Sequence, residues 1–209
     1  MVGALRSVID AQQKRMFTPS LSVARLGRLI FAQRSSRHLS RHRALFTVDR
    51  PHFQIEAACH AQDYELARQI FAEYGHSLSL DLSFQDFEQE VLQLPGAYTD
   101  PHGVLLLAKV DDHIAGCCAL RPLISCDYAN ACEMKHLYVR KPYRGLGLGR
   151  QLAEAVMDGA RRRGYSCVLL DTLDHMESAR ALYQDLGFED IPPYYYNPLP
   201  GAHYLKADL

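Results

Sequence analysis

Hydrophobic and polar residues alternate in some stretches of the chain and recur with helical spacing in others. Alternation over residues 52–57 predicts a short strand. Asp63 then caps a run of apolar residues with helical spacing, which predicts a helix that ends at Gly75. Residues 83–86 have the form of a capping box and predict the start of a second helix. The chain thus begins its folded part with one strand and two helices.

The rest of the pattern predicts strands in the middle of the chain and alternating helices and strands near its end. The predicted elements are a hairpin of residues 104–110 and 114–120, a strand at 131–139, a helix from 148, a strand at 166–171, a helix at 176–186 and a hairpin between 194 and 204. The order strand, two helices, three strands, helix, strand, helix, strand pair indicates an α/β fold with a mixed sheet.

Three glycines at alternate positions, Gly145, Gly147 and Gly149, separate the predicted strand at 131–139 from the next helix. Glycine lets the backbone turn tightly and leaves its N–H groups uncovered. Amides at the start of a helix, with the positive end of the dipole behind them, attract phosphate. The spacing fits neither the dinucleotide fingerprint nor the P-loop. We therefore interpret the run as a cradle for a pyrophosphate.

This run resembles the signature Gln/Arg-x-x-Gly-x-Gly/Ala of the GNAT acetyltransferase superfamily, with Arg144, Gly147 and Gly149 at the defined positions. Residues 133–139 resemble the fourth strand of that family, and residues 171–188 contain its later blocks in the right order. The resemblance covers about residues 52–209. It implies the GNAT fold, in which helices flank a mixed, mostly antiparallel central sheet whose fourth and fifth strands splay apart.

The resemblance also implies an activity, that of an N-acetyltransferase. Such an acyltransferase moves an acetyl group from acetyl-CoA, its cosubstrate, to a primary amine of a small molecule or peptide, and needs no metal. The first helices and the loop at residues 94–103 would flank the amine acceptor. The residues that the resemblance assigns to cofactor binding are Leu137, Val139, Arg144, Gly145, Leu146, Gly147, Leu148, Gly149 and Arg150.

Tyr183 is the candidate general acid. It matches the tyrosine of the family block Ala-x-x-Leu-Tyr-x-x-x-Gly-Phe, which protonates the departing thiolate. A phenol with an ordinary pKa of ~10 is protonated at neutral pH and can donate that proton. The alternative is that Tyr183 belongs only to the core, because it shares a helix face with Leu182 and Leu186.

Two residues compete for the role of base towards the amine. Glu133 begins the central strand, where the family often places a carboxylate, and His136 has a side chain whose ordinary pKa of ~6.5 suits the task. Strict alternation would direct Glu133 and His136 to opposite faces, so that only one could serve. Water is the third alternative.

One position departs from the family pattern. Many members have Asn seven residues before the block tyrosine, where it contacts the cofactor, and this chain has Met176. Ser178 or Asp174 could take over that contact, or it is missing. The departure supports a rival function, a catalytically silent CoA-binding protein with the GNAT fold.

Charge is distributed unevenly. Residues 1–50 contain ten Lys and Arg against two acids, whereas residues 51–209 contain 13 basic and 22 acidic residues. An acidic domain argues against nucleic acid as a partner and favours a small cation. No apolar run approaches the ~18 residues of a membrane helix.

The cysteines predict a reducing compartment. None of the six forms a C-x-x-C pair, and Cys117 and Cys118 lie in an apolar strand as small buried hydrophobes. We therefore expect a cytoplasmic location. The sequence leaves the oligomeric state open, a homodimer included.

Residues 1–50 form a basic, Arg- and Ser-rich extension ahead of a GNAT domain at residues 51–209. Its composition fits a transit peptide, which would direct the protein to the mitochondrial matrix, a disordered tail, or an upstream extension outside the folded protein. A further alternative is a tether to nucleic acid or membrane, which salt-dependent binding lost on deleting residues 1–45 would reveal.

A shortened chain tests whether the extension is packed against the domain. We expect a chain that starts near Phe46 to melt at the same temperature as the full chain. A large drop in melting temperature would show that residues 1–45 are packed.

Overall fold

The computed structural model describes residues 53–78 and 86–209, so the predicted extension at 1–50 and most of the predicted capping box lie outside it. The elements follow the predicted order. They are β1 (Phe53–Ala57), α2 (Ala61–Leu78), α3 (Phe87–Leu92), β2 (Val104–Val110), β3 (His113–Leu123), β4 (Ala131–Val139), the 3-10 turn η2 (Lys141–Tyr143), α4 (Leu148–Arg162), β5 (Cys167–Leu173), α5 (Glu177–Asp185), β6 (Glu189–Ile191) and β7 (Ala202–Asp208).

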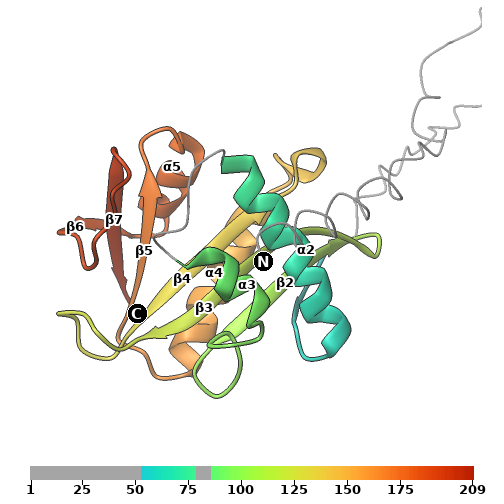
Figure 1. Cartoon of the computed structure of the whole chain (residues 1–209). Coiled ribbons are helices and arrows are strands. Elements are labelled where there is room, and N and C mark those ends of the chain that lie inside the picture. The colour runs from blue at the N-terminus through green and yellow to red at the C-terminus, as the bar shows by residue number, and fades with distance from the viewer. Residues whose placement is uncertain (1–52, 79–85) are drawn as a thin grey trace, which may run out of the picture. The chain divides into compact units, whose positions relative to one another are not determined.

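The strands of the described residues form one sheet in the order β1-β2-β3-β4-β5-β7-β6 (Figure 1). Neighbours are antiparallel except β4 and β5, which are parallel. The pairing of β4 with β5 runs only from Ala131↔Cys167 to Glu133↔Leu169. Beyond Glu133 the two strands have no mutual pairs, so the predicted splaying of the fourth and fifth strands is confirmed.

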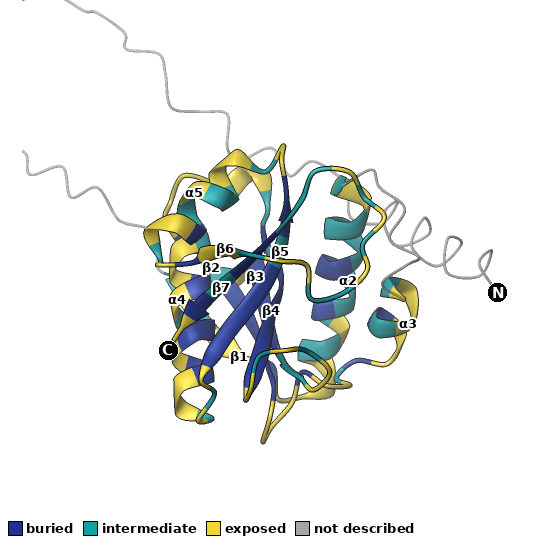
Figure 2. Cartoon of the chain, turned by 90° about the vertical axis from the view of Figure 1, so that its left-hand side faces the viewer, coloured by how far each residue is buried: buried dark blue, intermediate teal, exposed yellow. Residues whose placement is uncertain are grey.

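Helices cover both faces of the sheet (Figure 2). Leu152 and Val156 of α4 are fully buried against one face, in a cluster that also contains Tyr183 of α5. Ile70 and Phe71 of α2 are fully buried against the other face. The apolar residues of α4 and of α2 thus pack into two separate clusters of the core, one on each face of the sheet. Cys117 and Cys118 are buried within the sheet, as predicted.

The prediction that α2 ends at Gly75 is wrong, because the helix continues to Leu78. A Cβ atom at Gly75 would lie 2.7 Å from the ring of Phe87, which begins α3. The glycine therefore permits close packing of two helices rather than ending one. Among the described helices none is both long and apolar enough to cross a membrane.

A bulge in β4 overturns the predicted alternation of that strand. Cys117 pairs with Tyr138 and Ala119 pairs with Lys135, so one residue of β3 lies opposite two residues of β4, His136 and Leu137. His136 has the positive φ of 55° that such an extra residue often requires. The bulge reverses the alternation at this point and directs His136 to the face covered by α2 and α3.

The predicted C-terminal hairpin exists, but its first strand lies earlier than predicted. β6 precedes Pro192, and residues 192–201 connect it to β7. Tyr194 and Tyr195 therefore belong to this connection, and the Tyr194 hydroxyl donates to Glu133 of β4.

Candidate active site

The turn between η2 and α4, residues 144–147, presents free backbone amides. Gly145 and Gly147 have φ of 79° and 82°, which favours glycine over residues with a side chain. Within the described part of the chain, the N–H groups of Gly145, Leu146 and Gly147 have no acceptor. Residues 144–147 are exposed, and α4 begins at Leu148. This set of donors at a helix start fits a pyrophosphate.

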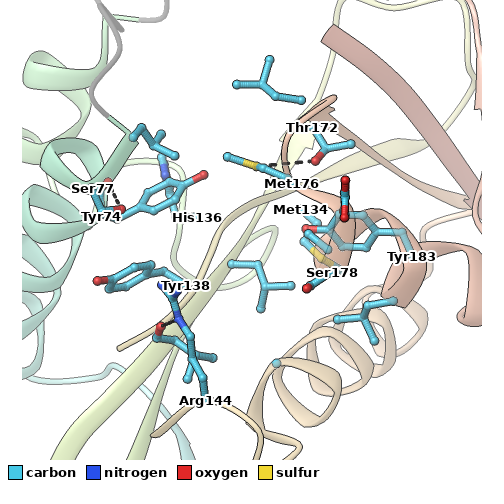
Figure 3. Close-up of a pocket in the computed structure, with 18 of the residues that line it drawn as sticks. Tyr74, Ser77, Met134, His136, Tyr138, Arg144, Thr172, Met176, Ser178 and Tyr183 are labelled. Carbon is cyan, nitrogen blue, oxygen red and sulfur yellow. Dashed lines mark hydrogen bonds between the residues drawn. The ribbon is translucent and has the colours of Figure 1, made fainter. Parts of the chain in front are cut away.

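The glycine turn is one wall of a cavity of about 850 Å³, called here the first cavity, which is of the size that small-molecule sites occupy. The first cavity also borders α5 and the end of β4. At that end the main chain of β4 no longer pairs with β5. Figure 3 shows Tyr183 and Ser178 on one side of it and Tyr74 and His136 on the other. The site therefore lies where the sheet opens.

Most of the predicted cofactor-binding residues line the first cavity. Those that do are Leu137, Val139, Arg144, Gly145, Gly147, Leu148 and Gly149. The side chain of Arg144 is held by its Nε, which donates to the carbonyl of Val139 at 2.8 Å. Leu146 and Arg150 are not among the lining residues, and Arg150 instead forms an ion pair with Asp185 at 2.8 Å.

Tyr183 is buried and still lines the first cavity, so it combines the core position with an accessible hydroxyl. Its hydroxyl has no hydrogen bond within residues 53–78 and 86–209, where Arg163 Nε is the only polar side-chain atom that is both sealed from solvent and unpaired. The Tyr183 hydroxyl therefore faces open space. Burial raises the pKa of Tyr183 well above its ordinary value, which keeps the proton on the phenol.

Glu133 lies outside the first cavity and is enclosed by hydrogen bonds. Only 1% of it is exposed. Arg121 donates to one carboxylate oxygen from two nitrogens, each at 2.7 Å, and the Tyr194 hydroxyl donates to the other at 2.8 Å. Glu133 lines a second cavity of about 700 Å³, on the side of α3.

His136 was predicted to lie on the opposite face from Glu133, and this is wrong. Because of the bulge, His136 packs against Phe71 of α2, with ring centroids 4.3 Å apart, and its Nε2 bonds the carboxylate of Glu90 on α3. Glu90 also forms an ion pair with Arg121, the partner of Glu133. The two candidate bases are therefore joined through Glu90 and Arg121 on one face of the sheet.

Burial disfavours the charge of Glu90, but hydrogen bonds from His136 and Tyr98 outweigh it and hold the pKa of Glu90 at about 2. Burial also lowers the pKa of His136, and the neighbouring carboxylate of Glu90 opposes this only in part. The pair is therefore a carboxylate beside a neutral imidazole. The sequence offered no signal for Glu90, which lies 46 residues before its partner.

The position that departs from the family pattern borders the first cavity. Met176 lines the cavity, and its sulfur accepts a weak bond from the Thr172 hydroxyl at 3.6 Å. Ser178 also lines it, whereas Asp174 does not and bonds His203 at 2.5 Å. Of the two alternatives, only Ser178 is placed to replace the missing Asn.

A sequence model of the Acetyltransferase (GNAT) family matches residues 64–188. The chain belongs to this acetyltransferase family. An uncharacterised N-acetyltransferase of Schizosaccharomyces pombe is 36% identical over 74% of this chain and 94% of its own length. An uncharacterised N-acetyltransferase of Dictyostelium discoideum is 29% identical over 62% of this chain and 86% of its own length.

Solved structures share the GNAT fold. An acetyltransferase from Streptococcus agalactiae superposes with a TM-score of 0.62 at 22% identity, over 75% of this chain and 98% of its own. A Salmonella typhimurium protein solved with its cofactor acetyl-CoA has a TM-score of 0.53 at 20% identity, over 75% of this chain and 94% of its own. The predicted GNAT fold and family resemblance are thereby confirmed.

Proposed function

We propose that this GNAT protein transfers the acetyl group of acetyl-CoA to a primary amine of a small molecule or peptide. The observation that carries this proposal is the set of free amides at residues 145–147, since Gly145 and Gly147 border the same cavity as the open edge of β4 and Tyr183. In this arrangement the amides and Arg144 hold the pyrophosphate. The main chain of Leu137 and Val139 lies beside the pantetheine arm, and one of its N–H groups serves as oxyanion donor.

The second cavity is the proposed acceptor site. Its charged lining residues are Asp86, Glu90, Glu133, Arg121 and Lys135, with three tyrosines between them. Both cations are already paired with carboxylates, Arg121 with Glu133 and Lys135 with Asp171. Lys135 lines both cavities, which supports an acceptor site next to the acyl donor. The remaining carboxylates and aromatic rings suit an ammonium group.

The chemistry needs an acid and a base. When bound, the thioester supplies an activated acetyl group, and the Tyr183 hydroxyl donates a proton to the departing sulfur. Glu133, enclosed by Arg121 and Tyr194, and His136, bordering the first cavity, are the candidates for accepting the amine proton.

A screen of amines with acetyl-CoA fixed tests this function. We expect cationic primary amines, and not nucleic acid, to cause release of CoA. Detection of the free thiol measures that release. The rival function, a catalytically silent CoA-binding protein, rests on Met176. Tight binding of acetyl-CoA without turnover of any amine in a broad panel would favour that rival.

A further inference from the structure

Glu90 joins the two cavities through a single side chain. It lines the second cavity, and its Oε1 bonds Nε2 of His136, which lines the first cavity. The Tyr98 hydroxyl donates to the same oxygen at 2.5 Å. The Glu90 carboxylate is only 14% exposed and is closely bound, although it is neither the acid nor a candidate base of the proposed reaction.

The bond to Glu90 determines which nitrogen of His136 is free. A carboxylate only accepts, so Nε2 carries the hydrogen and the neutral ring has its lone pair on Nδ1. In the described residues Nδ1 has no hydrogen-bond partner, and it is not among the sealed, unpaired atoms. Nδ1 therefore borders open space, and His136 lines the first cavity. His136, which carries this proton acceptor, lines the first cavity across from Tyr183 (Figure 3).

We infer that Glu90 is the positioning residue that makes His136 the general base for the acceptor amine. This inference rests on the proposed function. As the amine nitrogen forms its bond to the acetyl carbon, the C–S bond breaks. The amine proton moves to Nδ1 of His136, and the thiolate takes the proton of Tyr183. Proton exchange with solvent then returns His136 to its neutral form and Tyr183 to its protonated form. Glu90 stabilises the imidazolium that forms, as a carboxylate behind a catalytic histidine does.

The surroundings of His136 determine how its titration responds to Glu90. The charged or titratable groups that face it are Glu90, Tyr98, Tyr74, Lys135 and Arg121. Glu90 raises the pKa of His136, whereas Lys135 and Arg121 lower it together with burial. Removing the charge of Glu90 must therefore lower the pKa of His136 further and weaken it as a base.

The test is the pH dependence of turnover in Glu90→Gln. We expect kcat to fall about tenfold and the acidic limb of kcat/KM to move down by about one pH unit. Glu90→Asp, which keeps the charge, should keep the limb near its wild-type position. The matched control is Glu88→Gln, an exposed carboxylate on the same helix that lines neither cavity, and it should leave the profile unchanged.

Two outcomes would overturn the inference. In the first outcome, the wild type is active, and Glu90→Gln has the same kcat and the same acidic limb of kcat/KM as the wild type. The other is loss of the acidic limb in Glu133→Gln with the limb unmoved in Glu90→Gln, which would make Glu133 the base. If the wild type releases no CoA with any amine, it is the proposed function that fails.

Nitrogen NMR of the His136 ring gives a second measurement that does not depend on turnover. We expect the neutral ring of the wild type to carry its hydrogen on Nε2, and its pKa to fall in Glu90→Gln. A ring protonated on Nδ1 would contradict the inference even if Glu90→Gln failed to fold.

Discussion

Gly147→Asp should lower the affinity for CoA by at least about a hundredfold, or ~3 kcal/mol, and leave the fold intact. Aspartate tolerates the left-handed conformation at φ 82° and is a favoured residue before the first turn of a helix. Its carboxylate, however, would occupy the place of a phosphate oxygen and repel the pyrophosphate. Calorimetric titration with CoA measures the loss, and the melting temperature shows that α4 persists.

Gly164→Asp is the matched control for this substitution. Gly164 follows the other end of α4 with φ 77°, and a Cβ there would have nothing within 4 Å. A carboxylate at that end opposes the helix dipole and costs about 0.5 kcal/mol of stability, but it lies outside the first cavity. Gly164→Asp should therefore lose stability and keep CoA affinity. If Gly147→Asp bound CoA as well as this control, the phosphates would have to lie elsewhere.

The order of the elements could be predicted because it depends on local spacing. Helix α4 shows this well. Leu152 and Val156 are four residues apart, lie on one helix face and are both fully buried. The glycine turn could likewise be recognised, since its conformation follows from the lack of side chains at Gly145 and Gly147.

The face of His136 could not be predicted because it depends on a partner strand. The extra residue in β4 exists only relative to the pairs that β3 makes through Cys117 and Ala119. Nothing in the alternating run 133–139 indicates where that pairing shifts. The end of α2 was predicted wrongly for a related reason. The sequence does not distinguish a glycine that ends a helix from one that makes room for a neighbouring ring, as Gly75 does for Phe87.

The second cavity was also beyond sequence reasoning. Its lining comes from α3, the loop after α3, β3, β4 and the connection after β6, so Glu90, Arg121, Glu133 and Tyr194 meet only in the folded chain. Each residue alone is typical of a solvated surface. Their proximity, together with Lys135, is the basis for proposing the acceptor site here.

Tyr183→Phe should reduce kcat at least tenfold and leave the KM for acetyl-CoA nearly unchanged, because in the proposed reaction the lost hydroxyl protonates the leaving sulfur. That hydroxyl has no partner within the described residues, so its removal breaks no hydrogen bond and the melting temperature should hold. The raised pKa of Tyr183 also means that deprotonation of this phenol causes no loss of turnover as pH rises from neutral to about 9.

Tyr204→Phe is the control for a buried tyrosine without a catalytic role. Tyr204 is as buried as Tyr183, with 6% and 7% exposed, but it lies on β7 and lines neither cavity. Equal losses of kcat in the two variants, accompanied by equal drops in melting temperature, would assign Tyr183 to the core alone. Unchanged kcat of Tyr183→Phe across pH would remove the acid from the mechanism. A loss confined to Tyr183→Phe at constant stability requires the hydroxyl itself, since the two substitutions delete the same atom from equally buried rings.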